Sequence, residues 1–146
     1  MDESAECVRR IQFCSGHRVH RHESKCAHPH GHNYVAFIHA RAPELDPIGR
    51  VIDFSVLKQK VGGWIDENWD HGFIYYSGDA PMCRFFELNT DGKDFKSYMM
   101  PSNPTAENMA KYLVEEVCPT LMLGAEVEVF KVVLWETENC HAIYRK

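Results

Sequence analysis

Hydrophobic residues in this chain gather in short segments that polar or turn-forming residues separate. Residues 8–15 and 32–41 carry the bulky side chains that favour strands, and residues 127–135 have the strongest strand composition in the chain. Residues 142–144 form another such segment after polar residues at 138–139. The pattern therefore predicts four strands, two near each end of the chain.

Two further segments space their apolar residues as an amphipathic helix does. The first follows Asp53, whose side chain can cap a helix, and its apolar residues are Phe54, Leu57, Val61, Trp64 and Ile65. Glycines at 62 and 63 weaken its last turns, since each costs about 1 kcal/mol relative to alanine. The second helix is expected to begin near Thr105 and to stop before Pro119.

Residues 77–102 separate the two helices and contain several glycines and prolines. This segment is long for a connection in a compact domain, and it predicts an irregular insertion with ordered pieces at 85–88 and 95–100. The order of strands, helix, loop, helix and strands is typical of an α+β fold, with helices covering one face of an antiparallel sheet. A length of 146 residues predicts one domain over residues 1–146.

Composition excludes several classes of protein. The net charge of −5 argues against a nucleic-acid-binding protein, and no apolar run approaches the roughly 18 residues of a membrane span. The acidic N-terminus does not resemble a signal peptide. The six cysteines are widely scattered, which favours free thiols over disulfides and a cytoplasmic location.

A locally basic segment interrupts this acidic chain between residues 9 and 25. It holds five cations against one acid, Glu23; the cations are Arg9, Arg10, Arg18, Arg21 and Lys25. Such a segment suits a small polyanionic ligand, and it is equally compatible with a solvated surface loop.

The segment 26–32 is the richest in candidate metal ligands. His30 and His32 project from the same face if the chain is extended there, and His17 is a candidate third ligand. His28 has the same parity and is the competing histidine. Imidazole is a common zinc ligand, and a zinc site that keeps one coordination position open is typical of catalysis. The spacing therefore indicates a zinc site.

Other residues in the chain have both a chemical and a structural interpretation. Cys26 is a candidate base or nucleophile beside Lys25, a fourth metal ligand, or a small packed hydrophobe. The pair Asp70–His71 suits general acid–base catalysis, or merely ends a helix. Glu136 ends the strongest strand, where it can accept hydrogen bonds from an amidine-like ligand edge or serve as an ordinary surface acid.

Six motifs, in order along the chain, resemble those of the 6-pyruvoyl-tetrahydropterin synthase and 6-carboxytetrahydropterin synthase family. They are Phe13 to Arg18, Cys26 with His30 to Tyr34, Gly49 to Phe54, Trp69 to His71, Asn103 to Asn108, and Glu136 with Thr137. The resemblance implies a T-fold (tunnelling fold), an antiparallel four-stranded sheet with two helices on one face. It also implies a homo-hexamer, a dimer of trimers, whose sheets join into a barrel with active sites between subunits.

The resemblance assigns roles to the matching residues. His17, His30 and His32 would bind Zn²⁺, and Cys26 would be the catalytic base, working with Asp70 and His71. Glu136 would anchor a pterin ring with help from Thr105 and Glu107.

The implied substrate is 7,8-dihydroneopterin triphosphate. The three residues between Cys26 and His30 resemble the spacing in bacterial enzymes that form 6-carboxy-5,6,7,8-tetrahydropterin, acetaldehyde and triphosphate in queuosine biosynthesis. The alternatives are triphosphate elimination to the 6-pyruvoyl product and a non-catalytic oligomer that binds zinc or pterin.

Overall fold

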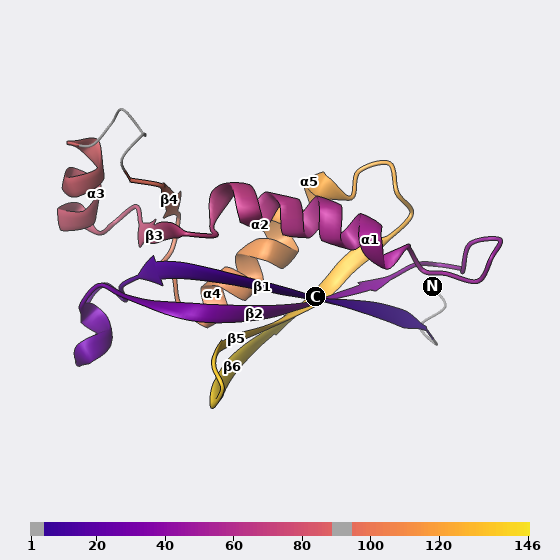
Figure 1. Ribbon diagram of the computed structural model, residues 1–146, viewed down its shortest axis with the longest axis horizontal. Coiled ribbons are helices and arrows are strands. Elements are labelled where there is room, and N and C mark those ends of the chain that lie inside the picture. The colour runs from indigo at the N-terminus through magenta and orange to yellow at the C-terminus, as the bar shows by residue number, and fades with distance from the viewer. Residues whose placement is uncertain (1–4, 89–94) are drawn as a thin grey trace.

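The computed structural model of the protein describes residues 5–88 and 95–146. Residues 1–4, part of the N-terminus that does not resemble a signal peptide, lie outside the described residues, as do residues 89–94 of the expected insertion. These described residues form one six-stranded sheet in the order β4-β3-β1-β2-β5-β6 (Figure 1). The strands are β1 (Glu6–His17), β2 (His30–Arg41), β3 (Gly72–Tyr76), β4 (Ser97–Met100), β5 (Glu128–Thr137) and β6 (Cys140–Arg145).

The four strands expected from the sequence form the antiparallel part of this sheet. β1 pairs with β2, β2 with β5, and β5 with β6, all antiparallel. The expectation of exactly four strands is wrong, because β3 adds to β1 and β4 adds to β3, both in parallel. The two added strands are short, and their partners are distant in sequence, so local composition gives little sign of them.

Two long helical segments cover one face of the sheet (Figure 1). Asp53 and Thr105 cap them as expected, each through a side-chain oxygen that accepts a backbone N–H. Each segment has a π-helical turn in its middle. The first comprises α1 (Phe54–Leu57), η2 (Lys58–Gly62) and α2 (Gly63–Asn68), and the second comprises α4 (Ala106–Tyr112), η3 (Leu113–Val117) and α5 (Cys118–Leu121).

The sequence predicted that the second helical segment would stop before Pro119. This prediction is wrong, because the segment continues through Pro119. α5 begins directly after the π-helical turn, and Pro119 lies in its first turn. A proline is tolerated in the first turn of a helix because the N–H that it lacks would have no intrahelical partner there. The π-helical turn therefore lets the helix restart with the proline in an acceptable position.

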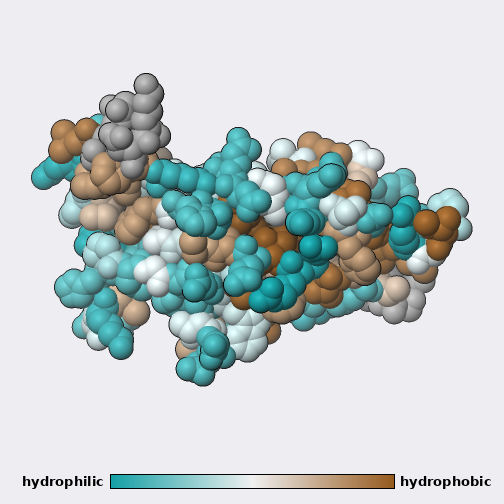
Figure 2. Space-filling model, in the orientation of Figure 1, coloured by the Kyte–Doolittle hydropathy of each residue, from teal (hydrophilic) through white to brown (hydrophobic). Residues whose placement is uncertain are grey.

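Residues 77–102 contain more regular structure than expected. A third helix, α3 (Ala80–Glu87), is capped by Asp79 and packs on β3, where the Phe86 ring stacks on Tyr75 with 4.8 Å between centroids. β4 then adds an edge to the sheet. Figure 2 shows hydrophobic surface around α3, at the end of the molecule that carries β3 and β4.

The core lies between the helical layer and the sheet. Its largest fully buried side chains include Trp69, Tyr34, Ile38 and Leu134. Alternate residues of β2 and β5 point to the other face, and there Val35, Phe37 and Val133 are only half-buried. No helix among the described residues is long and apolar enough to cross a membrane.

Candidate active site and metal centre

The β1–β2 ladder brings three histidines together at one end of the sheet. Their register places His17 directly opposite His30, and His32 lies two residues further along the same face of β2. The three rings are 4.6 to 5.1 Å apart between centroids. One nitrogen from each ring lies within 4.8 Å of the other two, so the three side chains can hold one metal ion.

Backbone carbonyls determine which ring nitrogens carry the protons. His17 Nδ1 lies 2.7 Å from the Pro104 carbonyl oxygen, and His30 Nδ1 lies 2.6 Å from that of His28. A carbonyl oxygen only accepts, so each Nδ1 must donate and each neutral ring has its lone pair on Nε2. The two Nε2 atoms face each other at 3.1 Å. Two acceptors so close repel unless a cation or a proton lies between them.

His32 supplies the third nitrogen, with Glu136 beside it. His32 Nε2 is buried and has no hydrogen-bond partner among the described residues, although Glu136 Oε1 lies 3.3 Å away. Burial is the main cause that lowers the pKa of His32; the Glu136 carboxylate opposes it and His30 adds to it. Glu136 thus lies at the histidine cluster, although its position at a strand end was equally compatible with an ordinary surface acid and only the resemblance assigned it to a pterin ring.

The lowered pKa values of His17 and His32 favour metal binding. Burial lowers the pKa of His17 to about 4, and the neighbouring His30 and His32 act in the same direction, against the Pro104 hydrogen bond. The ring is therefore neutral at pH 7 and can donate its Nε2 lone pair. Two nitrogens on one tetrahedral zinc ion are about 3.3 Å apart for Zn–N bonds of about 2.0 Å. The donor set therefore fits an ion with the coordination preferences of zinc.

The segment before α4 supports this cluster. The Asn103 side chain accepts from the His20 N–H and donates to the His20 carbonyl, both at 2.9 Å. The next residue, Pro104, supplies the carbonyl that holds the His17 ring. Thr105 uses its hydroxyl to cap α4, accepting from the Asn108 N–H at 3.1 Å, and the Glu107 side chain is exposed. Asn103 therefore joins two segments: the one that contains Pro104 and orients the His17 ring, and the one that contains His20 and follows β1.

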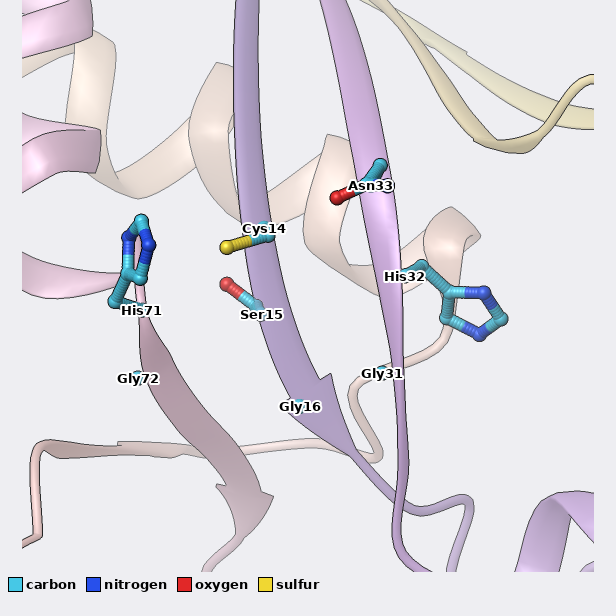
Figure 3. Close-up of a pocket in the computed structure, with 8 residues that line it drawn as sticks. All are labelled: Cys14, Ser15, Gly16, Gly31, His32, Asn33, His71 and Gly72. Atoms are coloured by element: carbon cyan, nitrogen blue, oxygen red, sulfur yellow. The ribbon is translucent and has the colours of Figure 1, made fainter.

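Asp70 and His71 lie on the other side of the β1–β2 ladder, together with Cys14. Figure 3 shows Cys14 and His71 there. Asp70 Oδ2 accepts from His71 Nδ1 at 2.8 Å, and Oδ1 accepts from the Cys14 N–H at 3.0 Å. Partial burial raises the pKa of Asp70, but these two hydrogen bonds, together with the charges of His71 and Lys96, hold the pKa below its usual value. The carboxylate is therefore ionised at pH 7 and orients the His71 ring.

Trp69 fixes the position of this pair. Its side chain is fully buried, and its carbonyl accepts from the Ser15 hydroxyl at 2.5 Å. His71 follows with a left-handed φ of +59°, which is uncommon for a residue with a side chain, and its N–H donates to the Cys14 carbonyl at 2.7 Å. Its side chain is 78% exposed and faces solvent.

Cys26 lies apart from both clusters. It belongs to the short turn η1 (Lys25–Ala27), is half-buried, and is not among the described residues whose donor atoms converge with the histidines or with Asp70. Its carbonyl accepts from the Val19 N–H at 2.8 Å, which holds the turn against the chain after β1. The geometry of one chain therefore gives no support to Cys26 as a fourth metal ligand.

The expected basic segment is dispersed in the structure. Arg18 pairs through two hydrogen bonds of 2.5 and 2.6 Å with the buried Asp79, which caps α3. Arg10 and Arg21 are exposed. Arg18 thus joins the end of β1 to α3, and the other cations remain at the surface.

Cys14 and Asn103 had no predicted role, although both lie in the motifs that carry the resemblance. The sequence shows only that Cys14 would project from the opposite face of a strand to His17, and that Asn103 directly precedes Pro104. Neither signal identifies a partner, because the partner of Cys14 is 56 residues away and that of Asn103 is 83 residues away.

Comparison with known proteins gives a consistent result. A family model described as 6-pyruvoyl tetrahydropterin synthase matches residues 6–146. The 6-carboxy-5,6,7,8-tetrahydropterin synthase of Rickettsia felis is 44% identical over 92% of this chain and 96% of its own length.

Solved structures share the fold. An uncharacterized protein from Wolinella succinogenes superposes with a TM-score of 0.82 at 24% identity, covering 97% of this chain and 98% of that one. The 6-pyruvoyl tetrahydropterin synthase of Caenorhabditis elegans has a TM-score of 0.66 at 25% identity, covering 97% of this chain and 95% of its own.

Proposed function

Because this chain belongs to the 6-pyruvoyl tetrahydropterin synthase family, we propose that it is a zinc-dependent lyase acting on 7,8-dihydroneopterin triphosphate. The proposed products are 6-carboxy-5,6,7,8-tetrahydropterin, acetaldehyde and triphosphate, and the proposal includes a role in queuosine biosynthesis and a cytoplasmic location. The observation that carries the proposal is the cluster of His17, His30 and His32, whose ring nitrogens converge, with Glu136 beside it.

The three histidines would hold zinc through one nitrogen each. Zinc supplies Lewis acidity when bound, which polarises the hydroxyl oxygens of the substrate's side chain and makes the neighbouring C–H groups more acidic. The protein's part is to keep the three nitrogens converged and unprotonated. The Pro104 and His28 carbonyls do this by fixing the Nδ1–H tautomers of His17 and His30.

Proton transfer is assigned to Cys26, Asp70 and His71. The Cys26 thiolate would remove a proton from a carbon of the side chain, and the His71 ring would carry a proton between side chain and pterin. Asp70 accepts the Nδ1–H of His71 at 2.8 Å, so it holds the ring with Nε2 free to exchange a proton. The high exposure of His71 leaves room for a substrate to approach that nitrogen.

The pterin ring would be anchored by Glu136, assisted by Thr105 and Glu107. A carboxylate can accept two hydrogen bonds from adjacent N–H groups on one edge of a pterin. Glu136 is one-quarter exposed at 3.3 Å from His32, so a ring held there would present its side chain to the histidine cluster. Thr105 and Glu107 begin the helix that follows the supporting segment.

We also propose a homo-hexamer with active sites between subunits. Two features of the chain support it. Asp70 and His71 lie on the opposite face of the β1–β2 ladder from the three histidines, so residues from more than one chain would be required to bring both sets to one substrate. The face of the sheet away from the helices carries Ile143, whose apolar side chain is 55% exposed and so is available for contact with another chain.

The similarity to the C. elegans protein makes the 6-pyruvoyl product the second candidate. Incubation of the zinc-loaded protein with 7,8-dihydroneopterin triphosphate, followed by product identification, separates the two. Acetaldehyde together with 6-carboxytetrahydropterin supports the proposal, and 6-pyruvoyl-tetrahydropterin supports the alternative. Absence of turnover by zinc-replete, assembled protein would contradict both and favour a binding protein.

A further inference from the structure

A second set of metal-binding atoms lies on the opposite face of the β1–β2 ladder from the three histidines. Cys14, Asp70 and His71 contribute a sulfur, a carboxylate oxygen and a ring nitrogen that all lie within 4.8 Å of one another. Figure 3 shows the Cys14 sulfur and the His71 ring directed toward each other from β1 and from the turn before β3. The proposed reaction uses Asp70 and His71 but assigns no role to this thiol.

Backbone hydrogen bonds hold these three residues together. The Cys14 N–H donates to Asp70 Oδ1 at 3.0 Å, and the His71 N–H donates to the Cys14 carbonyl at 2.7 Å. The two bonds join segments 56 residues apart in sequence, so the spacing of the donors does not depend on flexible side chains alone. The donor set is therefore largely preformed, and rotation of the exposed His71 ring can adjust the rest.

The cluster borders a cavity that can complete a coordination shell. The cavity measures about 360 Å³ and is lined by Cys14, Gly16, Asn33 and His71, among others. Zinc with three protein ligands takes a water or another small ligand as its fourth. The cavity has room for that ligand beside the three donors.

We propose that Cys14, Asp70 and His71 form a second site for a thiophilic divalent ion such as Zn²⁺. Thiolate, imidazole and carboxylate together suit zinc or cobalt, whereas magnesium and calcium prefer oxygen ligands alone. The site binds more weakly than the three-histidine cluster, because the ion must displace the hydrogen bond between Asp70 and His71 or share its atoms. It therefore fills after the first site.

Occupation of this site inhibits the enzyme, a consequence that rests on the proposed role of His71. An ion bound to the ring and to the Asp70 carboxylate removes the nitrogen lone pair and the orienting hydrogen bond that proton transfer requires. The activity of the protein should therefore rise with the first equivalent of zinc and fall with the second.

Cobalt titration of the metal-free full-length protein tests the binding directly. The first equivalent should give visible d–d bands without a thiolate band, because its ligands are imidazoles, and the second should add an intense thiolate-to-cobalt charge-transfer band in the near ultraviolet. Cys14→Ser should abolish that band and reduce bound cobalt from about two ions to about one per chain. Cys26→Ser, the matched cysteine control, should retain both ions and the band.

Two spectroscopic results would overturn the second site: no charge-transfer band in the wild-type protein, or a band that survives Cys14→Ser. In the turnover assay, excess zinc should inhibit the wild type at least 10-fold more than Cys14→Ser, whose activity at one equivalent should be unchanged. Equal inhibition of the two proteins would contradict the inhibitory role. If neither protein turns over the substrate, the proposed function fails, and the cobalt spectra still decide whether the site exists.

Discussion

At the scale of single residues, the histidine cluster depends on the groups that receive its Nδ1 protons. His17 and His30 each donate Nδ1–H to a backbone carbonyl, so both Nε2 atoms present lone pairs to the same point in space. Burial keeps the His17 ring neutral by lowering its pKa. These hydrogen bonds therefore direct both Nε2 lone pairs to the position where a cation would bind.

Cys26→Ala separates catalysis from metal binding. The substitution should abolish turnover, because it removes the proposed base, while bound zinc stays near one ion per chain as measured by elemental analysis at one added equivalent. Cys26 is half-buried in η1, outside the converging donors, so its loss should not disturb them. A variant that retains no zinc would instead make Cys26 a ligand.

Asn103→Ala should weaken zinc binding without touching a ligand. The Asn103 side chain holds the His20 backbone through two hydrogen bonds, and its loss frees the Pro104 carbonyl to move away from His17. Zinc affinity, measured by competition with a chromophoric chelator, should fall about 10- to 100-fold, as for other residues that orient ligands.

Asn68→Ala is the control for this substitution. It also removes a side-chain amide that donates to a backbone carbonyl, that of Trp64, but at the end of α2. Its zinc affinity should equal that of the wild type. Equal losses in the two variants would show that general destabilisation, and not the orientation of His17, controls metal binding.

At the scale of elements, the parts of the fold that follow from local pattern were predicted and the rest were not. The cap at Asp53 and the helical spacing after it predicted the first helix, and bulky apolar residues predicted the four antiparallel strands. The alternation along β2 likewise predicted that His30 and His32 share a face. The parallel strands β3 and β4 need partners that only the folded chain supplies. The proximity of Cys14 to Asp70 also arises only in the folded chain, because the two residues are 56 positions apart in the sequence.

The link between β1 and α3 should make stability depend on pH. Hydrogen bonds from Arg18 are the main cause that lowers the pKa of the buried Asp79. A carboxyl with a lowered folded pKa stabilises the protein above its unfolded pKa of about 3.9, and that contribution is lost as pH falls through the folded value. Asp79→Asn should therefore lower the unfolding free energy at pH 7 by roughly 1–3 kcal/mol.

Urea unfolding between pH 7 and pH 3 measures this effect. The difference between wild type and Asp79→Asn should be full at pH 7 and should shrink as pH falls through about 4, where the carboxyl takes up a proton in the unfolded chain before it does so in the folded one. Asp66→Asn changes an exposed carboxyl on α2 and is the matched control. A difference that stays constant down to pH 3 would mean that the charge of Asp79 contributes nothing.

At the scale of the whole molecule, the sheet divides the proposed chemistry between its faces. The helices bury one face, and the three histidines lie at its end. The other face carries the Cys14, Asp70 and His71 cluster and, further along, half-buried apolar residues such as Val133. A substrate that needs both sets of residues requires a second chain, which ties the proposed activity to the proposed assembly.

The open face should therefore control the oligomeric state. Ile143 lies opposite Val133 in the β5–β6 ladder and is 55% exposed, so Ile143→Glu places a charge on an apolar surface without emptying the core. The wild-type protein should elute as six chains by light scattering coupled to size exclusion. Ile143→Glu should shift the population to smaller species and lower turnover in parallel, because the divided site would come apart.

Ile48→Glu is the matched control, since Ile48 is 73% exposed in the turn between β2 and α1. It introduces the same charge away from the open face, and it should leave both mass and turnover unchanged. Circular dichroism of Ile143→Glu should show that the chain remains folded, because Val133 and its neighbours keep their contacts with β2. A folded, fully active monomer would contradict the assembly and would require one chain to bring both faces of its sheet to a single substrate.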